Sequence, residues 1–168
     1  MLVTKPYIRE RAVEYARRWA FNRNPLFNDY TGIGGNCTNF VSQCVLAGSC
    51  EMNFTPTFGW YYVSPTDRAP AWSGVEFLYN FLTGAPEYRQ ENGGQGPYAR
   101  LVTFAQGLRE GDIIQLANQE GDFYHTLIIT AVIVAVMGGG QRTCGENKSR
   151  SSIELPGDQN KLLMELKK

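Results

Sequence analysis

One stretch of the chain joins a flexible bend, a cysteine and the start of a helix, and it constrains the fold more than any other. Two glycines, Gly34 and Gly35, precede Asn36 and Cys37, and residues 38–48 carry apolar side chains at helical spacing. The pattern predicts a thiol at the N-terminus of a largely buried helix. The partial positive charge of a first helical turn favours a thiolate, and its free backbone N–H groups stabilise an oxyanion. We therefore predict that Cys37 is a nucleophile.

Length and composition limit the class of protein. The 168 residues suit one domain over residues 1–168, and 43% apolar with 19% charged residues indicate a globular chain. Sixteen Lys and Arg balance sixteen Asp and Glu, which argues against nucleic acid as a partner. The longest apolar run, 127–137, is shorter than the roughly 20 residues of a membrane-spanning helix, and no signal peptide is visible. We expect a monomer without a membrane span, and its localisation is unknown from the sequence.

The four cysteines do not form a metal or redox motif. No two of them have CxxC spacing, so neither a zinc site nor a redox pair is predicted, and we expect no metal and no cofactor. A Cys44–Cys50 or Cys50–Cys144 disulfide is compatible with the spacing. Buried free thiols are the expected state of Cys44 and Cys50.

Helices are predicted in the first half of the chain. Apolar residues at helical spacing between Pro6 and Asn24, with charged residues on the other face, predict an amphipathic helix. Ser73 and Glu76 match a capping box and predict the start of a further helix, which Gly84 ends.

An antiparallel sheet is predicted in the second half. Residues 85–97 are polar and glycine-rich and are expected to form an exposed loop. Segments 113–117, 123–136 and 141–146 then predict the strands of an antiparallel meander. The C-terminal segment 159–168 is expected to be a short weak helix or a frayed tail.

The single histidine, His125, lies early in the predicted strand 123–136. A side chain at that place can face the tip of a helix packed on the sheet. A thiol and an imidazole are the minimum apparatus for nucleophilic acyl transfer, because the imidazole takes the thiol proton. We predict that Cys37 and His125 form a catalytic pair, the alternative being that Cys37 is a buried structural cysteine. The Cys37 backbone N–H is one predicted oxyanion donor, and Tyr30, just upstream of the helix, is the candidate for the second.

Aromatic residues are frequent in segment 49–71, which is predicted to be a loop with a short strand. Trp60 and Tyr61 are candidates for the wall of a substrate cleft, because sugars and peptides stack well on aromatic rings. Core packing is an equal alternative for Trp60 and the preferred one for Trp72.

The order of these motifs resembles a known family. Residues 36–43, NCTNFVSQ, are similar to the DCTNFVSQ signature of the Putative amidase domain family, whose relatives include the NlpC/P60 and CHAP cell-wall hydrolases. Further similar segments are the opening helix up to Asn24-Pro25, Trp60-Tyr61-Tyr62, Gly111–Gln115 and Tyr124-His125-Thr126. The resemblance covers residues 7 to 155. It implies a papain-like α+β fold, with N-terminal helices packed on a C-terminal antiparallel sheet, in which Cys37 is the nucleophile and His125 the base.

Two positions depart from the family's pattern. Asn36 stands where the family usually has Asp, which removes a negative charge beside the thiolate. Cys144 stands where the family often has a second His, and a thiol is a poor partner for an imidazole N–H. Glu146 and Asn147 are therefore the candidates for the residue that orients His125. The alternative is that both are exposed turn residues and the orienting residue is missing.

The resemblance implies a bacterial cysteine hydrolase that cuts amide bonds of peptidoglycan. The bond is either within the stem peptide or between muramic acid and the stem. Such a protein acts at the cell wall, after secretion or release by lysis. One alternative is a catalytically weak or inactive cell-wall-binding module of the same fold. Another is a cysteine protease or acyltransferase that acts on proteins, since the same apparatus serves those substrates.

Overall fold

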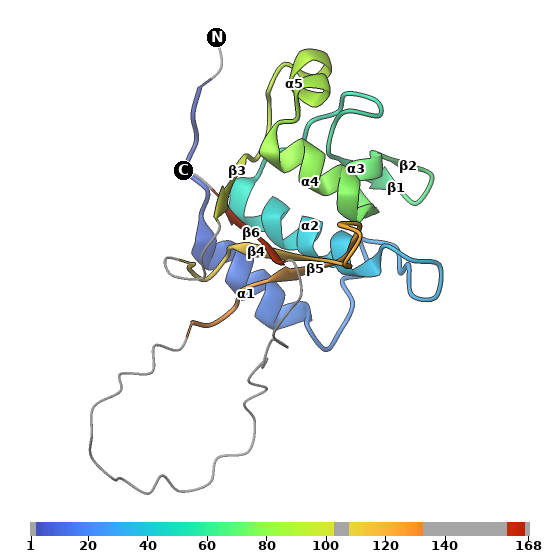
Figure 1. The fold of residues 1–168 in the computed structure, drawn as a ribbon. Coiled ribbons are helices and arrows are strands. Elements are labelled where there is room, and N and C mark those ends of the chain that lie inside the picture. Colours follow the sequence, from blue (N-terminus) through green and yellow to red (C-terminus); the bar gives the residue numbers. More distant parts are fainter. Residues whose placement is uncertain (1–2, 103–107, 133–160, 167–168) are drawn as a thin grey trace, which may run out of the picture.

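The computed structural model describes residues 3–102, 108–132 and 161–166, and it has an α+β architecture (Figure 1). Its helices are α1 (Arg9–Trp19), α2 (Asn36–Ser49), α3 (Pro70–Ser73), α4 (Val75–Thr83) and α5 (Pro86–Asn92). Its strands are β1 (Tyr62–Ser64), β2 (Asp67–Arg68), β3 (Ala99–Val102), β4 (Ile113–Ala117), β5 (Phe123–Ile128) and β6 (Lys161–Leu166). None of the described helices is long and apolar enough to cross a bilayer.

The larger sheet carries the order β3-β6-β4-β5, and every neighbouring pair is antiparallel. Strand β4 alternates strictly, with Ile113, Gln115 and Ala117 buried and the residues between them half-buried. Since successive side chains of a strand point to opposite faces, one face of the sheet is buried. Helices α2 and α4 pack on β5, and α1 packs on α2 (Figure 1). The N-terminus of α2 is thereby held beside β5.

The core between these layers is aromatic. Trp60 and Trp72 are fully buried and their ring centroids lie 5.2 Å apart. The ring of Phe81 from α4 stacks on Trp60, and Phe27 stacks on Trp72. Each indole N–H has a partner, since Trp60 Nε1 donates to Ser42 Oγ at 3.0 Å and Trp72 Nε1 donates to the side chain of Asn39. These bonds fix α2 to the aromatic core, because a buried indole N–H without an acceptor is costly.

Close packing of α1 against α2 depends on Gly48. A Cβ atom at this position would lie 2.3 Å from Cε2 of Tyr7 and 3.0 Å from the carbonyl oxygen of Ile8. Although a glycine often stops a helix, α2 continues past Gly48 to Ser49 and ends at Cys50, whose φ is 55° and whose N–H donates to Leu46 O. Gly48 thus serves helix packing rather than helix termination.

The Gly48→Ala variant is expected to lower the free energy of unfolding by about 1–3 kcal/mol, because the added methyl group forces α1 away from α2. Urea denaturation followed by circular dichroism measures the effect. The control is Ser49→Ala, which introduces alanine at the next position and is expected to change the free energy of unfolding by less than about 0.5 kcal/mol. Equal stabilities of the two variants would contradict this account of the packing.

The start of α1 is tied to the sheet by a buried ion pair. Asp112 is fully buried, and one of its carboxylate oxygens accepts from Arg9 Nη1. The Tyr7 hydroxyl donates to the carbonyl oxygen of Gly111 at 3.2 Å. Strand β4 begins directly after Asp112, so these contacts fix the sheet relative to α1 and therefore relative to α2.

Several predicted boundaries are corrected. The capping box at Ser73 is not formed: Gly74 precedes α4, and the Ser73 hydroxyl accepts from Arg68 Nε instead. Residues 85–97, predicted as a loop, contain α5, which begins at Pro86, a residue suited to a first helical position. Gly84, with φ of 67°, ends α4 as predicted.

The sheet also differs from the prediction. Segment 159–168 was expected to be a weak helix or a tail, yet residues Lys161–Leu166 form β6 between β3 and β4. The pairing of β6 with two strands overrides the helical preference of its sequence, because each pairing satisfies a row of backbone groups. Strand β5 ends at Ile128, and the strand predicted for residues 141–146 lies outside the described residues.

Candidate functional site

Cys37 lies at the tip of α2, as the sequence predicted. Gly35 is the N-cap residue with φ of 85°, and the helical ladder begins with the bond from Asn39 N to Gly35 O. The Cys37 N–H precedes that ladder and therefore has no partner within the helix. A Cβ atom on Gly35 would lie 2.6 Å from the carbonyl oxygen of Ser73, so glycine also lets the tip approach α3 closely. The half-buried thiol thus stands beside free N–H groups at a helix N-terminus.

Amide side chains hold the loop before α2. The Oδ1 atom of Asn36 accepts from the backbone N–H of Tyr30 at 3.2 Å, and its Nδ2 donates to Thr31. The buried Asn39 donates to the carbonyl oxygen of Asn28 at 3.1 Å. Sequence reasoning assigned no role to Asn39, although it lies two residues after Cys37 within the family-like stretch. Both amides fix the position of the helix tip.

A buried hydrogen bond joins the helix tip to β5. The hydroxyls of Thr38 and Thr126 lie 3.0 Å apart, and both side chains are at least 98% buried. Gln115 Nε2 donates to Thr126 Oγ1 at 3.3 Å and to the carbonyl oxygen of Val75. Thr38 and Thr126 follow Cys37 and His125 directly in the chain. The structure therefore brings the backbones of the two predicted catalytic residues to one place.

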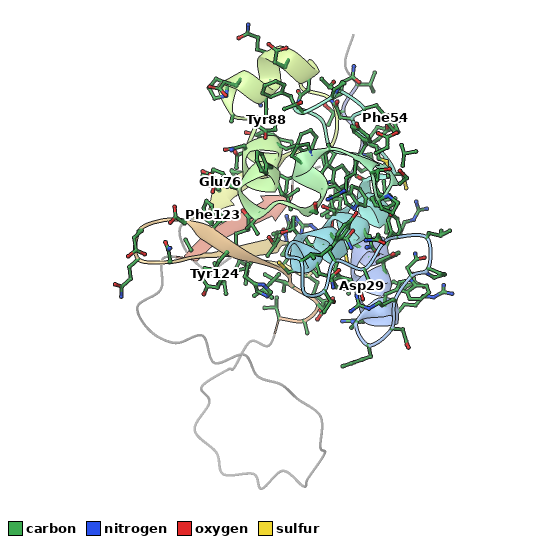
Figure 2. The ribbon with its side chains drawn as sticks, turned by 90° about the vertical axis from the view of Figure 1, so that its right-hand side faces the viewer. Asp29, Phe54, Glu76, Tyr88, Phe123 and Tyr124 are labelled. Carbon is green, nitrogen blue, oxygen red and sulfur yellow. The ribbon has the colours of Figure 1, made fainter. Side chains whose placement is uncertain are left out.

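The side chain of His125 is half-buried, and the register of β5 decides its direction. His125 pairs with Leu116, whereas Phe123 pairs with Ala117, so Tyr124 is an extra residue in a bulge. Figure 2 shows Phe123 and Tyr124 on opposite sides of β5. Thr126 points at α2, and the pairing is regular from His125 onward, so alternation directs the His125 side chain to the other face of β5.

The pairing of Cys37 with His125 therefore stays a prediction. The polar contact of the Cys37 thiol is Thr38 Oγ1 at 3.8 Å. Within the part of the chain that the structure describes, the His125 ring has no hydrogen-bond partner. Productive contact requires the imidazole to turn toward the thiol from the bulge.

The two threonines offer a test of how α2 is held. Thr38→Val or Thr126→Val alone is expected to lower the free energy of unfolding by about 1–3 kcal/mol, because each removes a hydrogen bond between two buried hydroxyls. The double variant is expected to cost less than the sum of the two single changes. Chemical denaturation of the four proteins gives the interaction energy, and strict additivity would show that the hydroxyls do not interact.

Tyr30, the predicted second oxyanion donor, is buried with its hydroxyl closed off from solvent. That hydroxyl has no hydrogen-bond partner of good geometry among the described residues, and burial raises its pKa against the opposing effect of Arg68. The Arg68 guanidinium lies over the Tyr30 ring, 4.5 Å from its centroid. The phenol is thus packed beneath Arg68, and the structure gives it no path to a substrate.

The predicted cleft wall divides into core and surface. Trp60 is fully buried, so the core alternative applies to it and the cleft-wall prediction does not. Trp72 is fully buried as expected. Tyr61 is half-buried against the exposed Phe54, with ring centroids 5.3 Å apart, and it stays accessible.

The other cysteines differ in exposure. Cys44 is a buried free thiol as predicted, and burial raises its pKa. Cys50 is a free thiol but exposed, which corrects the prediction of a buried one. Cys144 and the candidate orienting residues Glu146 and Asn147 lie outside the described residues.

Comparison with known proteins bears on this arrangement. A family described as Putative amidase domain matches residues 6–141. The uncharacterized protein YhbB of Bacillus subtilis (strain 168) is 32% identical over 128 residues, which are 74% of this chain and 37% of YhbB. The chain therefore spans well under half the length of that relative. No solved structure matches.

Proposed function

The chain belongs to the Putative amidase domain family, and we propose that it is a cysteine amidase or peptidase that hydrolyses amide bonds of peptidoglycan. Cys37 is the nucleophile and His125 is the base. The proposed fold is a single papain-like domain of the NlpC/P60 and CHAP kind. The site of action is the bacterial cell wall.

One observation supports this assignment above the others. The thiol stands at a helix N-terminus, and the next residue, Thr38, is hydrogen-bonded to Thr126, the neighbour of the only histidine. Nucleophilic catalysis by cysteine requires a thiol close to a base and N–H donors close to the reacting carbonyl. The tip of α2 carries the thiol and free N–H groups, and its residue Thr38 is bonded to the neighbour of the proposed base.

The proposed reaction has two steps. In the first, the Cys37 proton passes to the His125 imidazole and Sγ attacks the amide carbon, while the Cys37 N–H stabilises the oxyanion. The C–N bond then breaks, and the amine leaves with the proton from the imidazolium. In the second step, His125 takes a proton from water, whose oxygen attacks the thioester carbon. The C–S bond breaks, the acid is released and the proton returns to sulfur.

An orienting group for the imidazole completes the proposed site. Glu146 and Asn147 are the candidates, because a carboxylate or amide oxygen accepts the second ring N–H. Loss of such a group slows catalysis without abolishing it. Replacing Glu146 or Asn147 with alanine distinguishes the two candidates.

Digestion of purified peptidoglycan tests the proposed function. The His125→Ala variant is expected to release new amines at least about a hundredfold more slowly than the wild-type protein, because it lacks the base. The Tyr124→Phe variant changes the neighbouring residue and should retain the wild-type rate. Mass spectrometry of the products identifies the bond that is cut. An unchanged rate in His125→Ala would refute the role of His125.

A second candidate is a weak or inactive binding module, and one observation favours it. The described polar contact of the thiol is Thr38, not the imidazole. This candidate predicts that the wild-type protein sediments with peptidoglycan and releases no amines from it. A protein-directed protease or acyltransferase predicts turnover of a denatured protein substrate instead.

A further inference from the structure

A pocket of about 290 Å³ lies beside the Cys37 helix, and sequence reasoning did not predict it. One wall is the face of α2 that carries Asn36, Asn39, Phe40 and Gln43. These residues are spaced three and four apart and therefore share one side of the helix. The opposite wall is the end of α1 and the segment that follows it, including residues 19–24. Figure 1 shows α1 running alongside α2 at this place.

Cys37 directly follows Asn36, which lines the pocket, and its place on the helix is next to the lining face. At 100° per residue, Cys37 lies between Phe40, which faces the pocket, and Thr38, which faces β5. A ligand in the pocket therefore extends toward the thiol over the side chain of Asn36. A substrate whose bound part adjoins the scissile amide fits this geometry.

The pocket wall is mainly aromatic and amide in character. Most of its residues have aromatic or amide side chains, among them Trp19, Phe21, Phe40, Asn24, Asn36 and Gln43. Of the residues that line it, the charged one is Arg23, which pairs with Asp29 at 2.8 Å and donates to Thr31. None of the described residues that line the pocket is a carboxylate. The wall therefore suits a neutral ligand that has one apolar face and several amide or hydroxyl groups.

A buried amide points to the ligand more specifically. Gln43 is 94% buried, and its Oε1 accepts from the Tyr15 hydroxyl at 2.7 Å. That hydroxyl accepts in turn from Asn24 Nδ2, and burial raises the pKa of Tyr15 to about 12, so the phenol stays a donor. Gln43 Nε2 has no partner among the described residues. The pocket thus holds an oriented N–H donor that suits a carbonyl oxygen.

We propose that this pocket binds an N-acetylated sugar of the glycan strand, with the sugar face on the aromatic rings and the acetamide oxygen at Gln43 Nε2. The inference rests on the proposed function. It selects one of the two kinds of peptidoglycan amide bond that the proposed function leaves open. A stem peptide carries carboxylates and amines, whereas the charged residue of the described lining, Arg23, is already paired with Asp29, and no described lining residue is a carboxylate that could pair with an amine. The bond presented to Cys37 is then the amide that joins muramic acid to the stem.

Binding to an inactive protein tests this inference. The Cys37→Ala protein is titrated with a tetramer of N-acetylglucosamine, and nuclear magnetic resonance follows the amide side-chain signals. We expect saturable shifts of the Gln43 side-chain amide, and weaker binding of a glucose tetramer that lacks acetamide groups. Phe21→Ala is expected to weaken binding about tenfold, because the Phe21 ring is 96% exposed at the pocket and is not needed for the core.

The control is Phe77→Ala, which removes an exposed ring of the same type from α4 and should leave binding unchanged. No binding of the tetramer, or equal binding by the Phe21→Ala protein, would overturn the inference. Peptidoglycan hydrolysis without glycan binding would overturn it and leave the proposed function standing. Glycan binding by a wild-type protein that hydrolyses no amide would support the pocket and refute the proposed function.

Discussion

Replacing Cys37 with alanine is expected to reduce the release of amines from purified peptidoglycan by at least about a thousandfold. The reason is that both steps of the proposed reaction pass through a bond to Sγ, and no other described side chain at the tip of α2 supplies a nucleophile of that kind. Among the described residues, the polar contact of the half-buried thiol is Thr38 at 3.8 Å, so the variant should retain the stability of the wild-type protein.

The matched control changes the exposed free thiol. Cys50→Ser alters a cysteine at the other end of the same helix and should leave the hydrolysis rate unchanged. Circular dichroism of both variants checks that they are folded. Equal activity of the Cys37→Ala and wild-type proteins would remove the nucleophile assignment, whereas loss of activity in Cys50→Ser would point to a role for thiols outside the α2 tip.

Trp72→Ala is expected to give the largest loss of stability, about 3–5 kcal/mol in the free energy of unfolding. Trp72 is fully buried and contacts the rings of Phe27, Trp60 and Tyr62. Its Nε1 donates to Asn39 Oδ1 at 2.8 Å, so the truncation also leaves a buried acceptor without a partner. Small domains have about 5–15 kcal/mol in total, so much of the variant should be unfolded at 37 °C.

Denaturation in urea measures the free energy of unfolding of this variant. An exposed aromatic residue and a milder change at Trp72 serve as comparisons. Tyr98→Ala removes a ring that is 42% exposed and should cost less than about 1 kcal/mol. Trp72→Phe keeps most of the buried volume and loses the Nε1 hydrogen bond, so its cost should lie between the two. A Trp72→Ala protein within about 1 kcal/mol of wild type would contradict the role assigned to this ring.

Local signals carried much of the prediction. The start of α2 was predicted from Gly34-Gly35 and the residues that follow, because a left-handed N-cap and an apolar helix face are properties of a short stretch. The end of α4 at Gly84 is of the same kind, because this glycine has a positive φ. The family was recognisable because its motifs lie in order along the chain.

Features that depend on distant partners were missed or left open. Strand β6 exists because it pairs with β3 and β4, whose paired residues are 45 or more positions away in the chain, and its own sequence does not favour a strand. The burial of Trp60 follows from the acceptor on Ser42 and from the neighbouring rings, which spacing alone does not show. The direction of His125 depends on a bulge opposite Leu116 and Ala117, a backbone detail without a signal in the residue types.

The central claim is that Cys37 forms an acyl-enzyme, and the mass of the protein during turnover tests it most directly. Samples of wild-type and His125→Ala protein incubated with a soluble peptidoglycan fragment are quenched in acid, digested and analysed by mass spectrometry. The proposal predicts that the wild-type peptide containing Cys37 gains the mass of the acyl fragment, that the His125→Ala protein gains it more slowly because it lacks the base, and that a parallel sample of Cys37→Ala protein gains none and hydrolyses nothing. Undiminished hydrolysis by the Cys37→Ala protein, with no acyl group on Cys37 in the wild-type sample, would contradict it.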